Sequence, residues 1–306
     1  MNRSAPKNIV ASIQARLVDR SRELGVEHQL TLARFGGERL LYRLSKSEFA
    51  DRFILKGATL LLLWLGEPIR PTKDVDLLGF GDTSAEALKR VFVSVCAAEV
   101  PEDGLTFLPD SVQVEAIRED QEYGGMRVKL MAKLGNVRIP LQVDVGAGDA
   151  VVPPPEVLDF PGLLDLPRAH LRAYRPETSI AEKTEAMVRL ALANSRMKDF
   201  FDIHRLAETR TFDGETMRLA VAATFTRRGM DIPSERPLAL TSDFAQDAQK
   251  KVQWAAFVRR TRRPDLNDLP TIMTALDRFL WPVLQAAARP ETWPHTWTNG
   301  GPWKES

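Results

Sequence analysis

Residues 53–81 read Phe-Ile-Leu-Lys-Gly-Ala-Thr-Leu-Leu-Leu-Leu-Trp-Leu-Gly-Glu-Pro-Ile-Arg-Pro-Thr-Lys-Asp-Val-Asp-Leu-Leu-Gly-Phe-Gly. The pattern predicts a strand end, a glycine turn, an apolar helix, a loop and a short second strand. Asp74 and Asp76 lie two positions apart in that second strand, and a strand places residues i and i+2 on the same face. Two adjacent carboxylates indicate a divalent metal, because hard cations such as Mg2+ take oxygen ligands and cancel the repulsion.

The turn before the apolar helix predicts a phosphate site. A small-residue turn at a helix N-terminus offers backbone N–H groups and the positive end of the helix dipole, and this combination suits a phosphate. The loop to the second strand adds one cation and one hydroxyl. The candidate phosphate-binding residues are Lys56, Gly57, Ala58, Thr59, Arg70 and Thr72.

A third carboxylate, Asp144, follows in a stretch that alternates between apolar and polar residues over 136–145. Stretches 112–119 and 126–133, separated by Gly124-Gly125, predict two further paired strands. A site built on two metals needs more negative ligands than one pair supplies, so Asp144 is a candidate metal ligand beside Asp74 and Asp76. Periodicity alone leaves open that Asp144 is only the polar face of an edge strand.

An isolated Asp-x-Asp is more often a solvated strand edge, and an isolated Gly-Ala-Thr carries less information still. Their order, with an apolar helix between them and a further carboxylate downstream, favours a functional site.

The length of 306 residues is enough for two domains. We expect an α+β domain over residues 1–175, with a small mixed sheet and N-terminal helices, and a mainly α-helical domain over 176–306. Pro153-Pro154-Pro155 and the segment to about residue 176 read as a linker.

Charge and composition exclude several classes of protein. Forty-two basic and forty-one acidic residues leave a net charge of +1, so nucleic-acid contacts would depend on local patches. A single cysteine, Cys96, excludes an internal disulfide framework. No stretch approaches the roughly eighteen apolar residues of a membrane span, and no apolar signal core follows the polar N-terminus. These features predict a cytoplasmic protein without membrane contact.

The second domain carries two further candidates, Lys183 and Asp199, on helices expected over 177–193 and 196–208. Additional helices are expected over 213–226, 240–260 and 268–288. The local sequence alone leaves open that Lys183 and Asp199 are ordinary charged residues on amphipathic helices. A functional lysine would give a point charge to a triphosphate, and a functional aspartate would orient it or a hydroxyl nucleophile. The tryptophans of the C-terminal tail are expected to dock on their own domain.

Together these motifs resemble the nucleotidyltransferase-like toxins of the AbiEii/AbiGii family, a branch of the polymerase-beta-like nucleotidyltransferase superfamily. The resemblance covers roughly residues 45–210. Five segments in the family's order carry it: Phe-Ile-Leu-Lys-Gly-Ala-Thr, Arg-Pro-Thr-Lys-Asp-Val-Asp-Leu, Gln-Val-Asp-Val, Ala-Glu-Lys-Thr-Glu-Ala and Arg-Met-Lys-Asp-Phe-Phe-Asp-Ile.

By resemblance, Asp74 and Asp76 are the metal-binding pair, Gly57 belongs to the phosphate turn, and Lys183 and Asp199 complete the catalytic set. The family's turn is usually Gly-Gly or Gly-Ser, whereas here Ala58 follows Gly57, so either Thr59 supplies the hydroxyl contact or that contact is absent.

The resemblance implies a Mg2+- or Mn2+-dependent enzyme that moves a nucleoside monophosphate from a nucleoside triphosphate to RNA, with the tRNA 3′ end as the expected acceptor. It also implies a toxin of abortive infection and phage defence, neutralised by a cognate antitoxin. Two alternatives stay open. One is nucleotidylation of a protein hydroxyl, such as AMPylation, and the other is a non-catalytic interaction module on the same fold.

Overall fold

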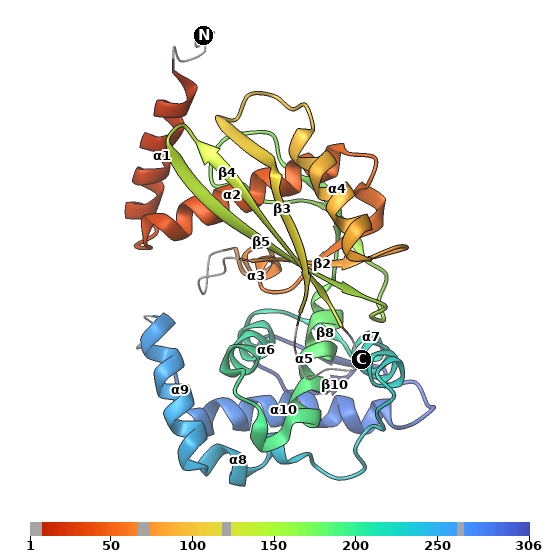
Figure 1. Cartoon of the computed structure of the whole chain (residues 1–306). Coiled ribbons are helices and arrows are strands. Elements are labelled where there is room, and N and C mark those ends of the chain that lie inside the picture. Colours follow the sequence, from red (N-terminus) through yellow and green to blue (C-terminus); the bar gives the residue numbers. More distant parts are fainter. Residues whose placement is uncertain (1–7, 67–73, 118–123, 262–265) are drawn as a thin grey trace. The chain divides into compact units, whose positions relative to one another are not determined.

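The computed structural model describes residues 8–66, 74–117, 124–261 and 266–306 (Figure 1). The chain divides into two compact units. Unit 1 comprises residues 1–148 and 156–173, and unit 2 comprises residues 149–155 and 174–306.

Unit 1 is built on a mixed seven-stranded sheet with the order β3-β4-β5-β2-β1-β7-β6. Its strands are β1 (Phe53–Lys56), β2 (Val75–Gly79), β3 (Leu105–Ala116), β4 (Met126–Leu134), β5 (Val137–Ala147), β6 (Glu156–Asp159) and β7 (His170–Ala173). The pairs β2·β5 and β1·β7 are parallel, and the other neighbours are antiparallel. The strands predicted on either side of Gly124-Gly125, and the one that follows them, are therefore confirmed as a meander.

Helix α2 covers one face of this sheet. The helices of unit 1 are α1 (Ile9–Glu23), α2 (His28–Lys46), α3 (Thr59–Leu65) and α4 (Ala85–Ala97), with a 3-10 turn at Ala50–Arg52. Gly36 and Gly37 do not interrupt α2. A Cβ on Gly36 would lie 2.9 Å from Leu141, and one on Gly37 would lie 3.3 Å from Val75. The two glycines therefore let α2 approach β5 and β2 closely, and they identify which face of those strands is the core face.

A buried ion cluster ties α2 to the start of β3. Asp103 is 2% exposed and accepts hydrogen bonds from Arg39 Nε at 2.9 Å and Arg43 Nη1 at 2.6 Å. Arg43 also lies over the ring of Phe107, and Arg39 donates to the carbonyl of Pro167. Burial raises the pKa of Asp103, but the hydrogen bonds from Arg43, Arg39 and the Leu105 backbone, together with the charge of Arg43, outweigh it, so the net pKa is lowered.

The segment predicted as a linker contains two strands, so that prediction was wrong in part. β6 and β7 pair with each other, and β7 adds to β1 through Leu55 and Ala173. Each strand has four residues, and β6 is mostly exposed. Such short strands lack the alternation of buried and exposed residues that reveals a strand in sequence.

Unit 2 is mainly helical. Its helices are α5 (Pro176–Leu190), α6 (Met197–Thr209), α7 (Gly214–Arg227), α8 (Ser242–Gln246), α9 (Ala248–Thr261) and α10 (Leu269–Ala287), with 3-10 turns at Ala191–Ala193 and Leu238–Leu240. A small sheet joins β8 (Phe212–Asp213), β9 (His295–Trp297) and β10 (Trp303–Glu305). The single helix expected over 240–260 is two helices that meet at Asp247.

The C-terminal tryptophans dock on unit 2, as predicted. Trp297 and Trp303 pack on Phe279 with ring centroids 4.8 and 5.7 Å away. Their indole N–H groups donate to the carbonyls of Ala207 and Phe279. The α+β class is confirmed, with a mixed sheet and many helices. None of the helices within the described ranges has the length and apolar character needed to cross a bilayer.

The cluster at Asp103 predicts a large stability effect. Asp103→Asn should lower the free energy of unfolding by about 3 kcal/mol, because two buried guanidinium groups lose their counter-ion. Glu102→Gln, at the exposed neighbouring position, should leave stability unchanged. Urea denaturation of both variants measures the difference, and equal stability of the two would contradict the role given to Asp103.

The same cluster predicts the sign of a pH effect. Because folding lowers the pKa of Asp103, its stabilising contribution is present above the unfolded-state pKa of about 3.9 and is lost as pH falls through the lower folded-state value. The difference between the wild type and Asp103→Asn should therefore shrink in acid.

Candidate functional site

Four charged residues stand side by side across four strands of unit 1. Lys56 on β1 is paired in register with Asp76 on β2, Asp76 with Asp144 on β5, and Asp144 with Arg127 on β4. Directly opposed residues project from the same face of a sheet. Val75 and Leu141 face α2, so Asp76 and Asp144, at alternate positions, project from the opposite face. We call these four residues the charged row.

The carboxylate of Asp76 lies against the backbone of Gly57. Gly57 has φ +76°, and an added Cβ would lie 2.6 Å from Asp76 Cγ and closer still to Oδ2. The turn thus combines a left-handed backbone with a space that a carboxylate already fills. Only glycine meets both conditions.

The predicted phosphate turn leads into a short helix, α3. Ala58 is right-handed (φ −68°) and caps α3, which has seven residues. The Thr59 hydroxyl donates to the carbonyl of Asp74 at 3.4 Å. Asp74, predicted within the second strand, lies immediately before β2, so this bond joins the first turn of α3 to the residue that precedes the strand. The roles of Lys56, Gly57, Ala58 and Thr59 toward a phosphate stay predictions. Arg70 and Thr72 lie outside the described residues.

Arg127 holds both carboxylate oxygens of Asp144. Its Nε donates to Oδ1 at 2.9 Å and its Nη2 to Oδ2 at 2.8 Å. The side chains are 32% and 22% exposed, so the pair is open to solvent on one side. The hydrogen bond to Asp144 raises the pKa of Arg127 above its ordinary value, and the charges of Asp144, Asp74 and Glu115 add to this effect. The charge of Asp74 therefore also acts on Arg127, a member of the charged row.

Asp74 and Asp76 are of the chemical kind that a magnesium ion in a phosphate-transfer site takes as ligands. Among the described residues, no group of three or more His, Cys, Asp or Glu side chains is arranged to hold a metal ion. Mg2+ in phosphate-transfer sites is typically bound by one or two carboxylates, several waters and the substrate's phosphates. Asp74 and Asp76 supply oxygen donors of that kind. The metal role of Asp144 stays a prediction, and a metal there would compete with Arg127.

In unit 2 the structure brings Lys183 and Asp199 together. Lys183, on α5, donates to Asp199 Oδ1 and to Asp202 Oδ2, the latter at 3.0 Å. Asp199 and Asp202 are three residues apart on α6 and share one face of that helix. The side chain of Asp202 is 0% exposed and that of Lys183 is 14% exposed. The lysine is therefore fixed between two carboxylates while part of it still reaches solvent.

Sequence reasoning missed Arg127 and Asp202 as functional candidates. Asp202 could have been found from its i, i+3 spacing to Asp199. Arg127 could have been found from the two-residue turn at Gly135 and Asn136, because counting outward from that turn places residue 127 opposite residue 144.

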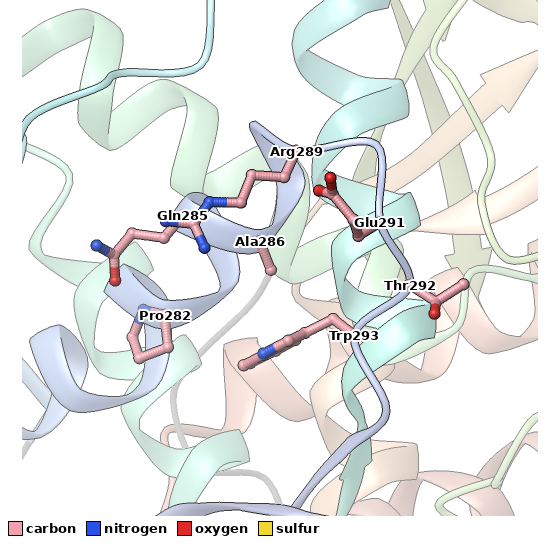
Figure 2. Close-up of a pocket in the computed structure, with 7 residues that line it drawn as sticks. All are labelled: Pro282, Gln285, Ala286, Arg289, Glu291, Thr292 and Trp293. Atoms are coloured by element: carbon pink, nitrogen blue, oxygen red, sulfur yellow. The ribbon is translucent and has the colours of Figure 1, made fainter.

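A separate hollow of about 300 Å³ lies at the C-terminal end of α10 in unit 2 (Figure 2). Arg289, Glu291 and Trp293 line it, and the indole of Trp293 stacks on His295. None of the predicted site residues lines this hollow. Arg289 and Glu291 are exposed, and we assign it no role in the candidate site.

The chain matches one protein family over more than half of its length. The family model described as nucleotidyl transferase AbiEii toxin, type IV TA system, matches residues 39–278. The chain belongs to this family. It is thus a nucleotidyltransferase of a toxin–antitoxin class, and the resemblance noted from its motifs is confirmed. No curated protein matches the chain.

Two solved structures from Helicobacter pylori are similar to the AbiEii-family chain. A candidate nucleotidyltransferase has 17% identity and a TM-score of 0.44, with 86% of this chain and 93% of that chain covered. JHP933 has 16% identity and a TM-score of 0.41, with 93% of this chain and 92% of that chain covered.

The contact between Gly57 and Asp76 predicts a difference between two glycine substitutions. Gly57→Ala should displace the Asp76 carboxylate and weaken Mn2+ binding by on the order of tenfold or more, because the new Cβ overlaps it. Gly66→Ala is the matched control, since Gly66 has the same φ of +76° but nothing within 4 Å of an added Cβ. Both should lose about 1 kcal/mol from backbone strain. Equal Mn2+ affinity in the two variants, measured by titration, would show that the overlap is without consequence.

The lysine between two carboxylates predicts a loss of stability on neutral replacement. Lys183→Met should cost about 3 kcal/mol, because Asp199 and Asp202 are left buried without their cation. Adding Asp202→Leu should restore part of that loss, and urea denaturation of the single and double variants measures it. Lys198→Met, at an exposed position of α6 next to Asp199, serves as control. A Lys183→Met variant as stable as Lys198→Met would contradict the pairing.

Proposed function

We propose that this chain transfers a nucleoside monophosphate from a nucleoside triphosphate to an RNA acceptor, namely the 3′ end of a tRNA. The observation that carries the proposal is the placement of Asp76, whose carboxylate lies on the Gly57 turn and in register with Asp144. Carboxylates next to a glycine turn bring metal-binding oxygens beside a backbone that can approach phosphates. The membership in a nucleotidyltransferase family supports the same chemistry.

Asp74 and Asp76, with Asp144 beside them, would hold Mg2+ or Mn2+. When bound, such an ion lowers the pKa of an attacking hydroxyl and neutralises charge that develops on the phosphate. The protein's own contribution is positional. The register between β2 and β5 fixes where the carboxylates stand, and the Gly57 backbone fixes how closely Asp76 approaches the turn.

The remaining predicted residues would serve the triphosphate. Lys56, at the end of β1, extends the charged row beyond Asp76, and we propose that it contacts phosphate together with Gly57, Ala58 and Thr59. Arg70 and Thr72 are proposed for the same role from sequence. Lys183 and Asp199 are proposed as further catalytic residues, with Asp202 as their positioning partner.

In the proposed reaction the acceptor hydroxyl attacks the α-phosphorus. One P–O bond forms, the bond to the departing pyrophosphate breaks, and the hydroxyl loses its proton. We further propose that the protein acts in the cytoplasm in abortive infection against phage, and that a cognate antitoxin neutralises it.

Incubation of the purified protein with Mg2+, total tRNA and each of the four α-labelled triphosphates tests the transfer. The wild type should label RNA with one preferred nucleotide. Asp76→Ala should reduce labelling by at least about a thousandfold, the magnitude expected when a group that stabilises the transition state is lost. Asp110→Ala removes an exposed carboxylate from β3 of the same unit and should retain full activity.

The other outcomes separate the alternatives. Label on protein in place of RNA would assign nucleotidylation of a protein hydroxyl. No label on either, together with no binding of a magnesium-bound nucleotide, would assign a non-catalytic interaction module. Full activity in Asp76→Ala would remove Asp76 from the site.

A further inference from the structure

Asp144 has a partner that no sequence motif specified. Both of its oxygens are engaged by the guanidinium of Arg127, with donor distances of 2.9 and 2.8 Å. The amide of Gln142 also donates to Oδ1 at 3.3 Å. A carboxylate that accepts a two-pronged bond from arginine has its charge neutralised and its orientation fixed.

The strand register makes this pairing a property of the backbone. Arg127 and Asp144 are directly opposed on β4 and β5, and Asp76 is directly opposed to Asp144 on the other side. Asp144 thus has a carboxylate neighbour on one side and a guanidinium neighbour on the other. The β4–β5 ladder is continuous from residues 126 and 145 to the turn, so neither residue can slip away from the other without loss of the ladder.

A cation held at Asp144 has a direct consequence for metal binding. A divalent ion gains affinity from each further carboxylate ligand, and Asp144 is the neighbour of Asp76 that could supply one. The guanidinium occupies the oxygens that the ion would need, and its positive charge repels an ion placed there.

We infer that Arg127 is a positioning residue that keeps Asp144 out of the metal-binding set in the nucleotide-free protein. A metal then meets Asp74 and Asp76, while Asp144 stays bound to the guanidinium. This inference rests on the proposed function, since it assumes that Asp74 and Asp76 bind metal. It goes beyond that proposal by giving Asp144 and Arg127 a shared role.

The test measures Mn2+ binding to the full chain without nucleotide or RNA. Titrations followed by the electron paramagnetic resonance signal of free Mn2+ give the affinity, and water-proton relaxivity reports the inner-sphere water on the bound ion. Arg127→Ala should tighten Mn2+ binding by on the order of tenfold and should lower the relaxivity, because Asp144 replaces coordinated water. Asp144→Asn should leave both values within about twofold of wild type.

The double variant Arg127→Ala/Asp144→Asn distinguishes two explanations for a gain in Mn2+ affinity. One is direct coordination of the ion by Asp144, and the other is the loss of the positive charge of Arg127. The double variant should return both the affinity and the relaxivity to wild-type values. Arg138→Ala is the matched control, because Arg138 lies on the same face of β5 as Asp144, six residues away, or about 20 Å along the strand. It should have no effect.

Three results would overturn the inference. The first is weakened Mn2+ binding in Asp144→Asn alone, which would make Asp144 a ligand in spite of Arg127. The second is unchanged relaxivity in Arg127→Ala, and the third is a gain in affinity that persists in the double variant. Because none of these readouts needs catalysis, absence of transfer to RNA would leave the test intact. Conversely, unchanged Mn2+ binding in Asp76→Ala would indicate failure of the proposed site itself.

Discussion

The candidate site depends on the close approach between the Asp76 carboxylate and the Gly57 backbone. The conformational preferences of the local sequence alone do not account for this contact. Gly57 adopts a left-handed φ that side chains disfavour, and Asp76 fills the space in which a side chain at position 57 would lie. The antiparallel register of β1 and β2 produces the contact, because pairing Lys56 with Asp76 sets the next residue, Gly57, beside the carboxylate. The glycine turn and the acidic strand thus form one structural unit.

The order of charges along the row limits the repulsion between its two carboxylates. Asp76 and Asp144 are neighbours on parallel strands, but Lys56 and Arg127 stand at the two ends. Like charges directly opposed in a sheet are destabilising, and opposite charges offset this cost. The two cations at the ends of the row therefore offset part of the repulsion between the two adjacent acids. A metal that bound in this row would compete with these cations, most directly with Arg127 at Asp144.

Local patterns were sufficient to predict most of the elements and to single out the candidate site residues of unit 1. The strand, turn, helix and strand around Gly57 and Asp76 follow from apolar runs and glycine positions, and the alternation around Asp144 revealed β5. Family resemblance singled out Lys183 and Asp199, but their contact was not predicted, because two charges sixteen residues apart on different helices give no local signal. β6 and β7 were missed because their four residues each have no alternation to detect.

The register between strands was not predicted from the sequence. The reason differs for the two residue pairs that involve Asp144. The Arg127–Asp144 pair is set by a two-residue hairpin turn, so counting from Gly135 and Asn136 would have revealed it. The Asp76–Asp144 pair joins parallel strands that are connected through α4, β3 and β4. No turn fixes such a register, which depends on how the apolar faces of β2 and β5 pack under α2. Sequence could therefore identify the two carboxylates but not their adjacency.

The two buried ion clusters differ in how far a ligand could reach them. At Asp103 a single carboxylate meets two arginines, and all three side chains are at most 6% exposed. Such a cluster fixes α2 against β3 and leaves no group for a ligand to reach. At Lys183 a single cation meets two carboxylates, and 14% of the lysine side chain remains exposed.

Buried ion pairs are weak evidence for stability, since apolar side chains can replace them without loss. A lysine that is held in one orientation and still meets solvent has a property that an apolar replacement would lack. That property is a charge in a fixed position, which is what binding a phosphate requires.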